Sequence, residues 1–358
     1  MNKKVIAVAI ASAFAASGAY ADATLYGKFH GSVDMIDSDS ANEDNWEVNS
    51  RSSRVGIKGS EDLGGGLKAI YQLELSVNID GGGDGQDNPS SGLGGSSRNT
   101  FVGFSGDWGT GFIGRHDTPA KVAFYGAGVE NLGDSALDLN SGNNLGRKNT
   151  ISGQSGNAPL GVISEYRAND TIVYVSPNFA GFTFLAAAIP GEDNDDVGDE
   201  RDGIADHYSF GAIYKGGGLK ASLGYANYNS GNGGIGDTDV DQKVAQASAS
   251  FTFGAFKIGG SYEYTDNYVF DDDSDYNAWA VTGQWKFGNN AINAAYVDSN
   301  YNSENVDGME KDGWGIGLEH NFSKRTQVYA AYASATAEPD NGSDDDNDIF
   351  SLGMVHKF

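Results

Sequence analysis

Six of the eight arginines in this chain of 358 residues lie in one stretch, between positions 51 and 167. A guanidinium group stays charged at physiological pH, so it binds or steers anions and does not act as a general acid or base. The same stretch contains Glu130, Asp134 and Asp138. Cations that face carboxylates across a narrow, water-filled throat create a strong transverse field, because the surrounding protein has a low dielectric constant. Brought together in such a space, these residue types would select among charged and polar solutes, so the elements that position them decide what they do.

Residues for covalent or metal-assisted chemistry are scarce. The chain has no cysteine, and its five histidines are too widely separated to form a local metal motif. Residues 109–114, GTGFIG, match a dinucleotide-binding pattern, but they occupy a predicted tight turn before a strand and do not open a helix. We therefore predict no catalytic residue, no dedicated metal site and no cofactor. The net charge of −26 disfavours nucleic acid as a partner.

Residues 1–21 have the organisation of a cleaved export signal. Two lysines precede an apolar run over 5–16, and A-Y-A at 19–21 forms a small-residue cleavage site. The apolar run is too short for a membrane-spanning helix. We predict cleavage after position 21, which leaves 22–358 as a single domain whose net charge changes from −26 to −28 because both lysines are removed.

The remaining chain alternates apolar and polar residues with a period of two. In residues 67–77 every odd position is apolar, whereas Lys68, Gln72, Glu74 and Ser76 occupy even positions. This period indicates β-strands with one apolar face. Residues 350–358, FSLGMVHKF, repeat the pattern up to the terminal aromatic residue. A lipid environment explains so many apolar faces, and because lipid offers no hydrogen bonds, the strands must close into a ring.

The connectors between these strands alternate between short and long. Short connectors lie at 61–66, 106–110, 177–181, 215–218, 253–256, 287–290 and 322–326. Long connectors, acidic and rich in glycine, asparagine and serine, lie at 38–50, 80–97, 116–166, 191–205, 229–241, 266–275, 299–311 and 337–348. Strict alternation is typical of an up-and-down barrel with turns at one rim and loops at the other. We predict an all-β fold, a transmembrane antiparallel β-barrel of about 16 strands.

Five segments of the chain resemble the Gram-negative general porins. They are SRVGIKGSEDLGGGLKAIYQLE at 53–74, IGR at 113–115, SPNFAGF at 176–182, FSKRT at 322–326 and the terminal MVHKF. The resemblance runs from Ala23 to Phe358. It implies a barrel in the outer membrane of a Gram-negative bacterium, assembled as a homotrimer, in which each barrel is a passive aqueous pore for small hydrophilic solutes and ions. It also implies that the barrel assembly machinery recognises Phe358, which would lie at the membrane boundary.

The longest connector, 116–166, is the third long one. The third loop of porins folds into the barrel and narrows it, so the resemblance places a constriction here. We expect the loop acids Glu130, Asp134 and Asp138 to face a wall of basic residues across the throat. The predicted wall has five basic residues. Lys28, Arg54 and Arg115 occupy the alternate positions of their strands that face the lumen, and Arg98 and Arg167 lie at strand starts.

Two other functions remain open at this point. A substrate-specific outer-membrane channel would have the same barrel with a saturable site or an aromatic track. An acidic secreted β-adhesin would be soluble without detergent, but it would have to bury about as many apolar faces as the barrel has strands. The acidic runs at 192–202, 271–275 and 344–348 are expected to form a solvated rim. Weak binding of Ca²⁺ or Mg²⁺ there would bridge the loops to lipopolysaccharide phosphates.

Overall fold

A computed structural model describes residues 22–38, 45–80, 92–139, 167–191, 203–229, 240–268, 271–304, 307–340 and 342–358. The predicted export signal at 1–21 and the acidic run at 192–202 lie outside the described residues, as does the second part of the third long connector, 140–166. No helix among the described residues is long and apolar enough to cross a bilayer.

The described chain consists of β-strands and one helix. The elements are β1 (Asp22–Ser38), β2 (Asn45–Ser50), β3 (Arg54–Gly64), β4 (Leu67–Asn78), β5 (Gly92–Ser97), β6 (Thr100–Gly106), β7 (Gly109–Asp117), α2 (Pro119–Ala127), β8 (Arg167–Val175), β9 (Phe182–Ile189), β10 (His207–Gly216), β11 (Leu219–Asn229), β12 (Asp241–Phe253), β13 (Phe256–Asp266), β14 (Ser274–Phe287), β15 (Asn290–Ser303), β16 (Met309–Asn321), β17 (Thr326–Pro339) and β18 (Asp345–Lys357).

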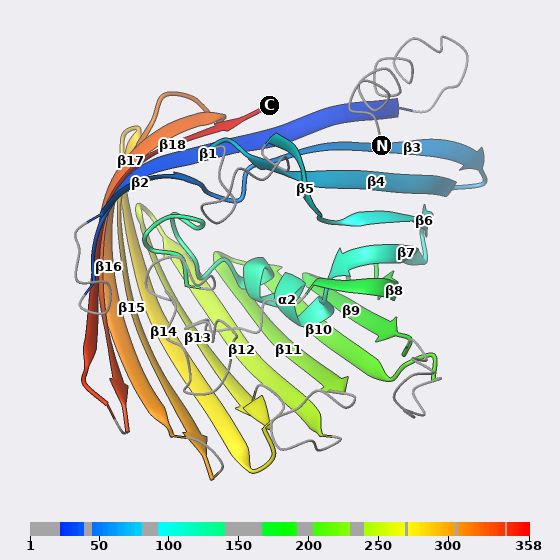
Figure 1. Cartoon of the computed structure of the whole chain (residues 1–358). Coiled ribbons are helices and arrows are strands. Elements are labelled where there is room, and N and C mark those ends of the chain that lie inside the picture. The colour runs from blue at the N-terminus through cyan, green and yellow to red at the C-terminus, as the bar shows by residue number, and fades with distance from the viewer. Residues whose placement is uncertain are drawn as a thin grey trace.

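All strands belong to one closed antiparallel sheet (Figure 1). β1 pairs with β3 near its start and with β2 near its end, so β2 and β3 are two parts of one barrel strand. β4 pairs with β5 and β6 in the same way. The segments therefore make the sixteen barrel strands that the sequence predicts. The pairing of β1 with β18 closes the barrel.

The barrel reverses the usual distribution of polar and apolar residues. On β1, Phe29 and Val33 are exposed on the outer surface, whereas His30, Ser32 and Asp34 are buried on the inner side. The same alternation of exposed and buried residues continues around the sheet, for example along β16 and β18. Exposed apolar side chains on the outer face of the described barrel fit a lipid solvent, and polar residues inside fit a water-filled lumen.

The turns and loops occupy opposite rims, but several strands run further than predicted. β15, β16, β17 and β18 extend into the connectors predicted at 299–311 and 337–348. β2 lies within the connector predicted at 38–50. The start of β18, DDND at 345–348, is polar on both faces and lacks the apolar alternation that marks a strand in lipid, whereas β2 is short and carries only Trp46 and Val48 on its exposed face. Backbone hydrogen bonding continues the sheet there beyond the membrane.

The last residue completes the closure of the barrel. The backbone N–H of Phe358 donates to the Gly27 carbonyl, and the Gly27 N–H donates to the Phe358 carbonyl, each over 3.1 Å. The Phe358 ring lies 5.4 Å from the ring of Phe29, centre to centre, and is itself exposed. The terminal aromatic residue thus lies on the outer face, at the rim that carries the short turns.

Candidate functional site: a charged constriction inside the barrel

The third long connector enters the barrel as a helix, although only a long loop is predicted there. Thr118 caps α2, its hydroxyl accepting from the Lys121 N–H, and Pro119 stands at the first helical position. Gly128 ends the helix with a φ of 60°, a conformation that favours glycine. A threonine followed by proline and a later glycine is a recognisable helix signal. Figure 1 shows α2 within the ring of strands, where it contacts β9 to β12.

Residues 118–139, called L3 from here on, pack their apolar side chains against the inner wall. Small residues on β14, β16 and β17 leave the necessary room. A side chain at Gly315 would meet Leu137 at 3.1 Å, and one at Gly317 would meet Leu132 at 2.9 Å. Val129 and Leu139 are almost fully buried in the same cluster. The glycine and alanine pattern of the inner wall is therefore the surface on which L3 lies.

Polar side chains of the wall bind the backbone of L3. Gln246 donates to the carbonyl of Ala120 over 2.5 Å, and Ser250 donates to that of Ala127 over 2.6 Å. Lys257 donates to the Gly128 carbonyl over 2.9 Å, and Thr282 donates to that of Val129 over 2.6 Å. These residues come from β12, β13 and β14, so L3 follows the inner wall across neighbouring strands. The prediction that the third loop folds into the lumen is confirmed for its described part.

The tip of L3 reaches the start of the barrel. Asp134 forms an ion pair with Lys28 on β1, and the Ser52 side chain also bonds to it. Ser52 belongs to the break between β2 and β3 and has a φ of 50°. Burial alone would raise the pKa of Asp134, but the Lys28 ammonium and the Ser52 hydroxyl hold it below its usual value. L3 thus spans the lumen and is anchored at both ends.

Glu130 and Asp138 lie behind this tip and do not face the basic wall. Glu130 accepts from the Leu139 N–H over 3.2 Å and shares a side-chain hydrogen bond with Asp138. Asp138 accepts from the Asp134 N–H over 3.1 Å. Burial first, and then the Asp138 and Asp134 carboxylates, raise the pKa of Glu130 well above its usual value. The expectation that all three acids line the throat is therefore wrong for Glu130 and Asp138, because both are used to fold the loop.

The opposite shifts of Glu130 and Asp134 predict a pH dependence of L3 packing. Protonated Glu130 stabilises the packed state of L3 fully below the ordinary carboxyl pKa of about 4. Above that pH the released loop ionises more readily, so this stabilisation declines by about 1.4 kcal/mol per pH unit until the raised pKa is passed. Ionised Asp134 stabilises the packed state of L3 fully above the ordinary carboxyl pKa, and this stabilisation is lost as the pH falls through the lowered pKa of Asp134. L3 should be held most firmly near pH ~4 and loosen toward alkaline pH.

Glu130→Gln tests this account, since glutamine keeps the shape and cannot ionise. Single-channel current noise should rise with pH in the wild type and lose that rise in Glu130→Gln, while any increase at acid pH, caused by Asp134, is retained. An alkaline rise that is the same in both proteins would contradict the assignment.

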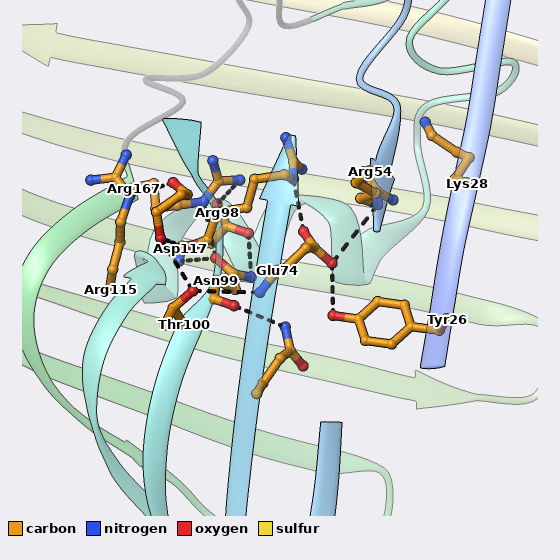
Figure 2. Close-up of polar contacts among 12 residues, drawn as sticks. Tyr26, Lys28, Arg54, Glu74, Arg98, Asn99, Thr100, Arg115, Asp117 and Arg167 are labelled. Atoms are coloured by element: carbon orange, nitrogen blue, oxygen red, sulfur yellow. Dashed lines mark hydrogen bonds and ion pairs between the residues drawn. The ribbon is translucent and has the colours of Figure 1, made fainter. Parts of the chain in front are cut away.

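The basic wall gathers around Glu74 on β4 (Figure 2). Arg98 Nε donates to one carboxylate oxygen over 2.7 Å. Arg54 Nε lies 4.0 Å from the other oxygen, to which the Tyr26 hydroxyl donates over 2.9 Å. Arg54, Glu74 and Tyr26 share the inner parity of their strands with Lys28. The predicted positions of Lys28, Arg54 and Arg98 at the lumen wall are therefore as the structure places them.

A second group of charges forms around Asp117 at the end of β7 (Figure 2). Arg167 lies 2.9 Å from its carboxylate, and Lys121 on α2 lies 3.1 Å from it. Asn99 donates to the same carboxylate over 2.9 Å and accepts from Arg167 Nε over 2.9 Å. Arg167 is thus placed beside the wall as predicted, and Asp117 joins the start of L3 to β8.

Arg115 is predicted to face the lumen, but the structure places it on the outer face of β7. The register pairs it with Thr100, on the face that also carries Ile113, whose side chain is 57% exposed on the outer surface. The lumen-facing neighbour in sequence is His116, which packs against the ring of Phe112. The Arg115 guanidinium donates to the Ser97 carbonyl and to Asn169. Figure 2 shows it at the edge of the cluster.

Basic charge exceeds acidic charge on this wall. Five basic side chains share three carboxylates, and Arg115 lies nearby. The basic side chains are Lys28, Arg54, Arg98, Lys121 and Arg167, and the acids are Glu74, Asp117 and Asp134. Among the described residues, these ion-paired side chains carry two more positive than negative charges in a narrow space between low-dielectric walls, which attracts anions and raises their local concentration.

Four members of the site were missed at the sequence level, namely Tyr26, Glu74, Asp117 and Lys121. Glu74 has the parity of the polar face of 67–77, which was a usable signal. The role of Asp117 depends on Asn99 and Arg167, which are distant in the sequence. No group of three histidines or acids in the described ranges is arranged to hold a metal ion.

Comparisons with known proteins agree with this architecture. The family model for Gram-negative porins matches residues 7–341. The outer membrane porin protein 32 of Delftia acidovorans is 29% identical over 340 residues, which cover 93% of this chain and 89% of that protein. An anion-selective porin from Comamonas acidovorans superposes with a TM-score of 0.70 at 23% identity, covering 94% of this chain and 100% of that one. The trimer form of OmpT from Vibrio cholerae superposes with a TM-score of 0.62 at 16% identity, covering 94% of this chain and 99% of that one.

Proposed function

The chain belongs to the Gram-negative porin family, and we propose that it is a general diffusion channel whose constriction prefers anions. The observation that carries the proposal is the excess of basic over acidic side chains in the described ion pairs between L3 and the wall from β1 to β8. As an outer-membrane porin, the protein provides a passive, water-filled path for small hydrophilic solutes and ions.

The acidic net charge does not oppose this preference. Charged groups more than about 8–10 Å apart are largely screened at physiological ionic strength, so acids on the outer loops act weakly on an ion in the throat. The basic residues around Glu74 and Asp117 act at short range. L3 sets the width of the path, and the surplus charge filters what passes.

Salt substitution tests the proposal. Single-channel conductance should fall strongly when chloride is replaced by a large, slow anion such as gluconate, and only slightly when potassium is replaced by lithium. A conductance that follows the cation would contradict anion preference. A saturating conductance for one solute would favour a substrate-specific channel instead.

We also infer that the protein assembles as a homotrimer in contact with outer-membrane lipid and lipopolysaccharide, after recognition of Phe358 by the barrel assembly machinery. The trimeric form of a solved structural neighbour supports the stoichiometry, and the exposed terminal ring supports the recognition.

The effect of Phe358→Ala tests the assembly step. The amount of folded protein in the outer membrane should fall several-fold, while the same variant refolded in detergent keeps its conductance. Unheated gel migration before and after cross-linking reads the oligomer. Equal membrane levels of variant and wild type would contradict the recognition role.

A further inference from the structure

Four lysines form a second basic region inside the barrel, near the rim of short turns. They are Lys215 on β10, Lys220 on β11, Lys257 on β13 and Lys286 on β14. Each has the parity of a buried inner-wall residue of its own strand. The buried reference residues are Ile213, Ser222, Gly259 and Thr282. All four therefore point into the lumen from one side, nearer to the rim of short turns than α2 and L3 are. This set is called the lysine crescent from here on.

The strand register brings like charges together in the crescent. Lys215 is directly opposite Lys220, an arrangement that is unfavourable between two cations in a sheet. Lys257 faces Gln284, two positions from Lys286 on the same side of β14, a diagonal separation of roughly 7–8 Å between the backbone positions. Lys220 and Lys257 meet at Gly128. A side chain added to Gly128 would lie 3.4 Å from the Lys220 ammonium, and Lys257 donates to the Gly128 carbonyl.

Acids of the described chain compensate these charges only in part, through the attraction of Glu130 for Lys257. Lys215, Lys220, Lys257 and Lys286 form no ion pair with any described carboxylate. The nearby Glu130 is buried in L3 and shares its hydrogen bond with Asp138. Glu319 lies on the inner face of β16, two strands from Lys286, and accepts from Asn321. The C-terminal end of α2 contributes only a partial negative charge.

We propose that the lysine crescent is a binding site for small anions that carry two or more charges, on the periplasmic side of the constriction. Short turns mark the periplasmic rim in outer-membrane barrels. Several ammonium groups on neighbouring strands hold a multivalent anion better than a monovalent one, since each adds an attraction. The proposal rests on the proposed function in one respect, namely that anions reach the lumen.

Block of chloride current by inorganic pyrophosphate tests the site. In channels inserted in one orientation, pyrophosphate should block from one side at a several-fold lower concentration than from the other. In the combined variant Lys215→Gln, Lys220→Gln, Lys286→Gln, that lower half-blocking concentration should rise by roughly tenfold. This variant keeps Lys257 and its bond to Gly128, so the position of L3 is preserved.

Lys324→Gln with Arg325→Gln is the control, because it removes two of the positive charges of an exposed turn at the same rim, against three removed in the crescent variant. The half-blocking concentration of pyrophosphate in this control should equal that in the wild type. Equal block from both sides of the wild type, unchanged block in the crescent variant, or the same loss in the control would each overturn the proposal. Chloride-over-potassium preference measured in the same membranes reports on the constriction separately, so sided block without anion preference would leave the site standing and reject the proposed function.

Discussion

Replacing Arg54 and Arg98 together with glutamine is expected to remove most of the anion preference and to lower the chloride-over-potassium permeability ratio roughly tenfold. Both arginines contact Glu74, and without them that carboxylate keeps only the Tyr26 hydroxyl among its described partners. The wall would then hold three basic side chains against three acids. A unit charge acting over ~8 Å at an effective dielectric constant of ~40 is worth about 1 kcal/mol, and salt reduces the sum of two such losses.

Two further variants separate charge from structure in this experiment. Arg54→Lys with Arg98→Lys retains both charges and should keep most of the preference. Lys324→Gln with Arg325→Gln removes the same number of charges far from the throat and should leave the ratio unchanged. The reversal potential in a potassium chloride gradient measures the ratio in all of them. An unaltered ratio in the glutamine variant would show that these arginines only neutralise Glu74.

Asp134→Asn is expected to detach the tip of L3 for part of the time. The change leaves the Lys28 ammonium, which is buried at 8% exposure of its side chain, without its carboxylate. Removing one partner of a buried pair costs about 3–5 kcal/mol, but the Asp134 side chain is 34% exposed, so we expect roughly 1–2 kcal/mol here. That loss raises the detached fraction about tenfold or more and should appear as rapid fluctuations of the single-channel current.

The barrel itself should be unaffected, because L3 contributes nothing to the strand pairing. Thermal unfolding and gel mobility of Asp134→Asn are therefore expected to match the wild type. Adding Lys28→Met removes the unpaired buried cation and should make the channel quieter than Asp134→Asn alone. A quiet trace from the single variant would mean that Ser52 and the wall contacts of L3 hold the tip without the ion pair.

The fold was predictable from sequence because its period is so regular. In a barrel with lipid outside and water inside, successive strand residues face lipid and water in turn. Apolar and polar residues therefore alternate, as they do at 67–77. Short turns and long loops then fix the order of the strands. The place of L3 in the lumen followed from loop order and the resemblance to porins, and the described half of the loop confirms it.

The details of the site depend on features that alternation does not record. The breaks at 51–53 and 98–99 change which side chains face inward, so the positions of Arg54 and Arg98 depend on local geometry. Alternation predicts that Arg115 faces the lumen, but its strand carries His116 on that face. The pairing of Lys28 with Asp134 joins residues that are far apart in the chain, and only the path of L3 brings them together.

The reversal potential of the wild-type channel under a potassium chloride gradient tests the central claim most directly. If the basic wall beside L3 filters ions, the potential will have the sign of chloride permeation, with a permeability ratio clearly above one that falls as ionic strength rises. A potential of the opposite sign, carried by potassium, would contradict the account and show that the acids of the pore outweigh this wall.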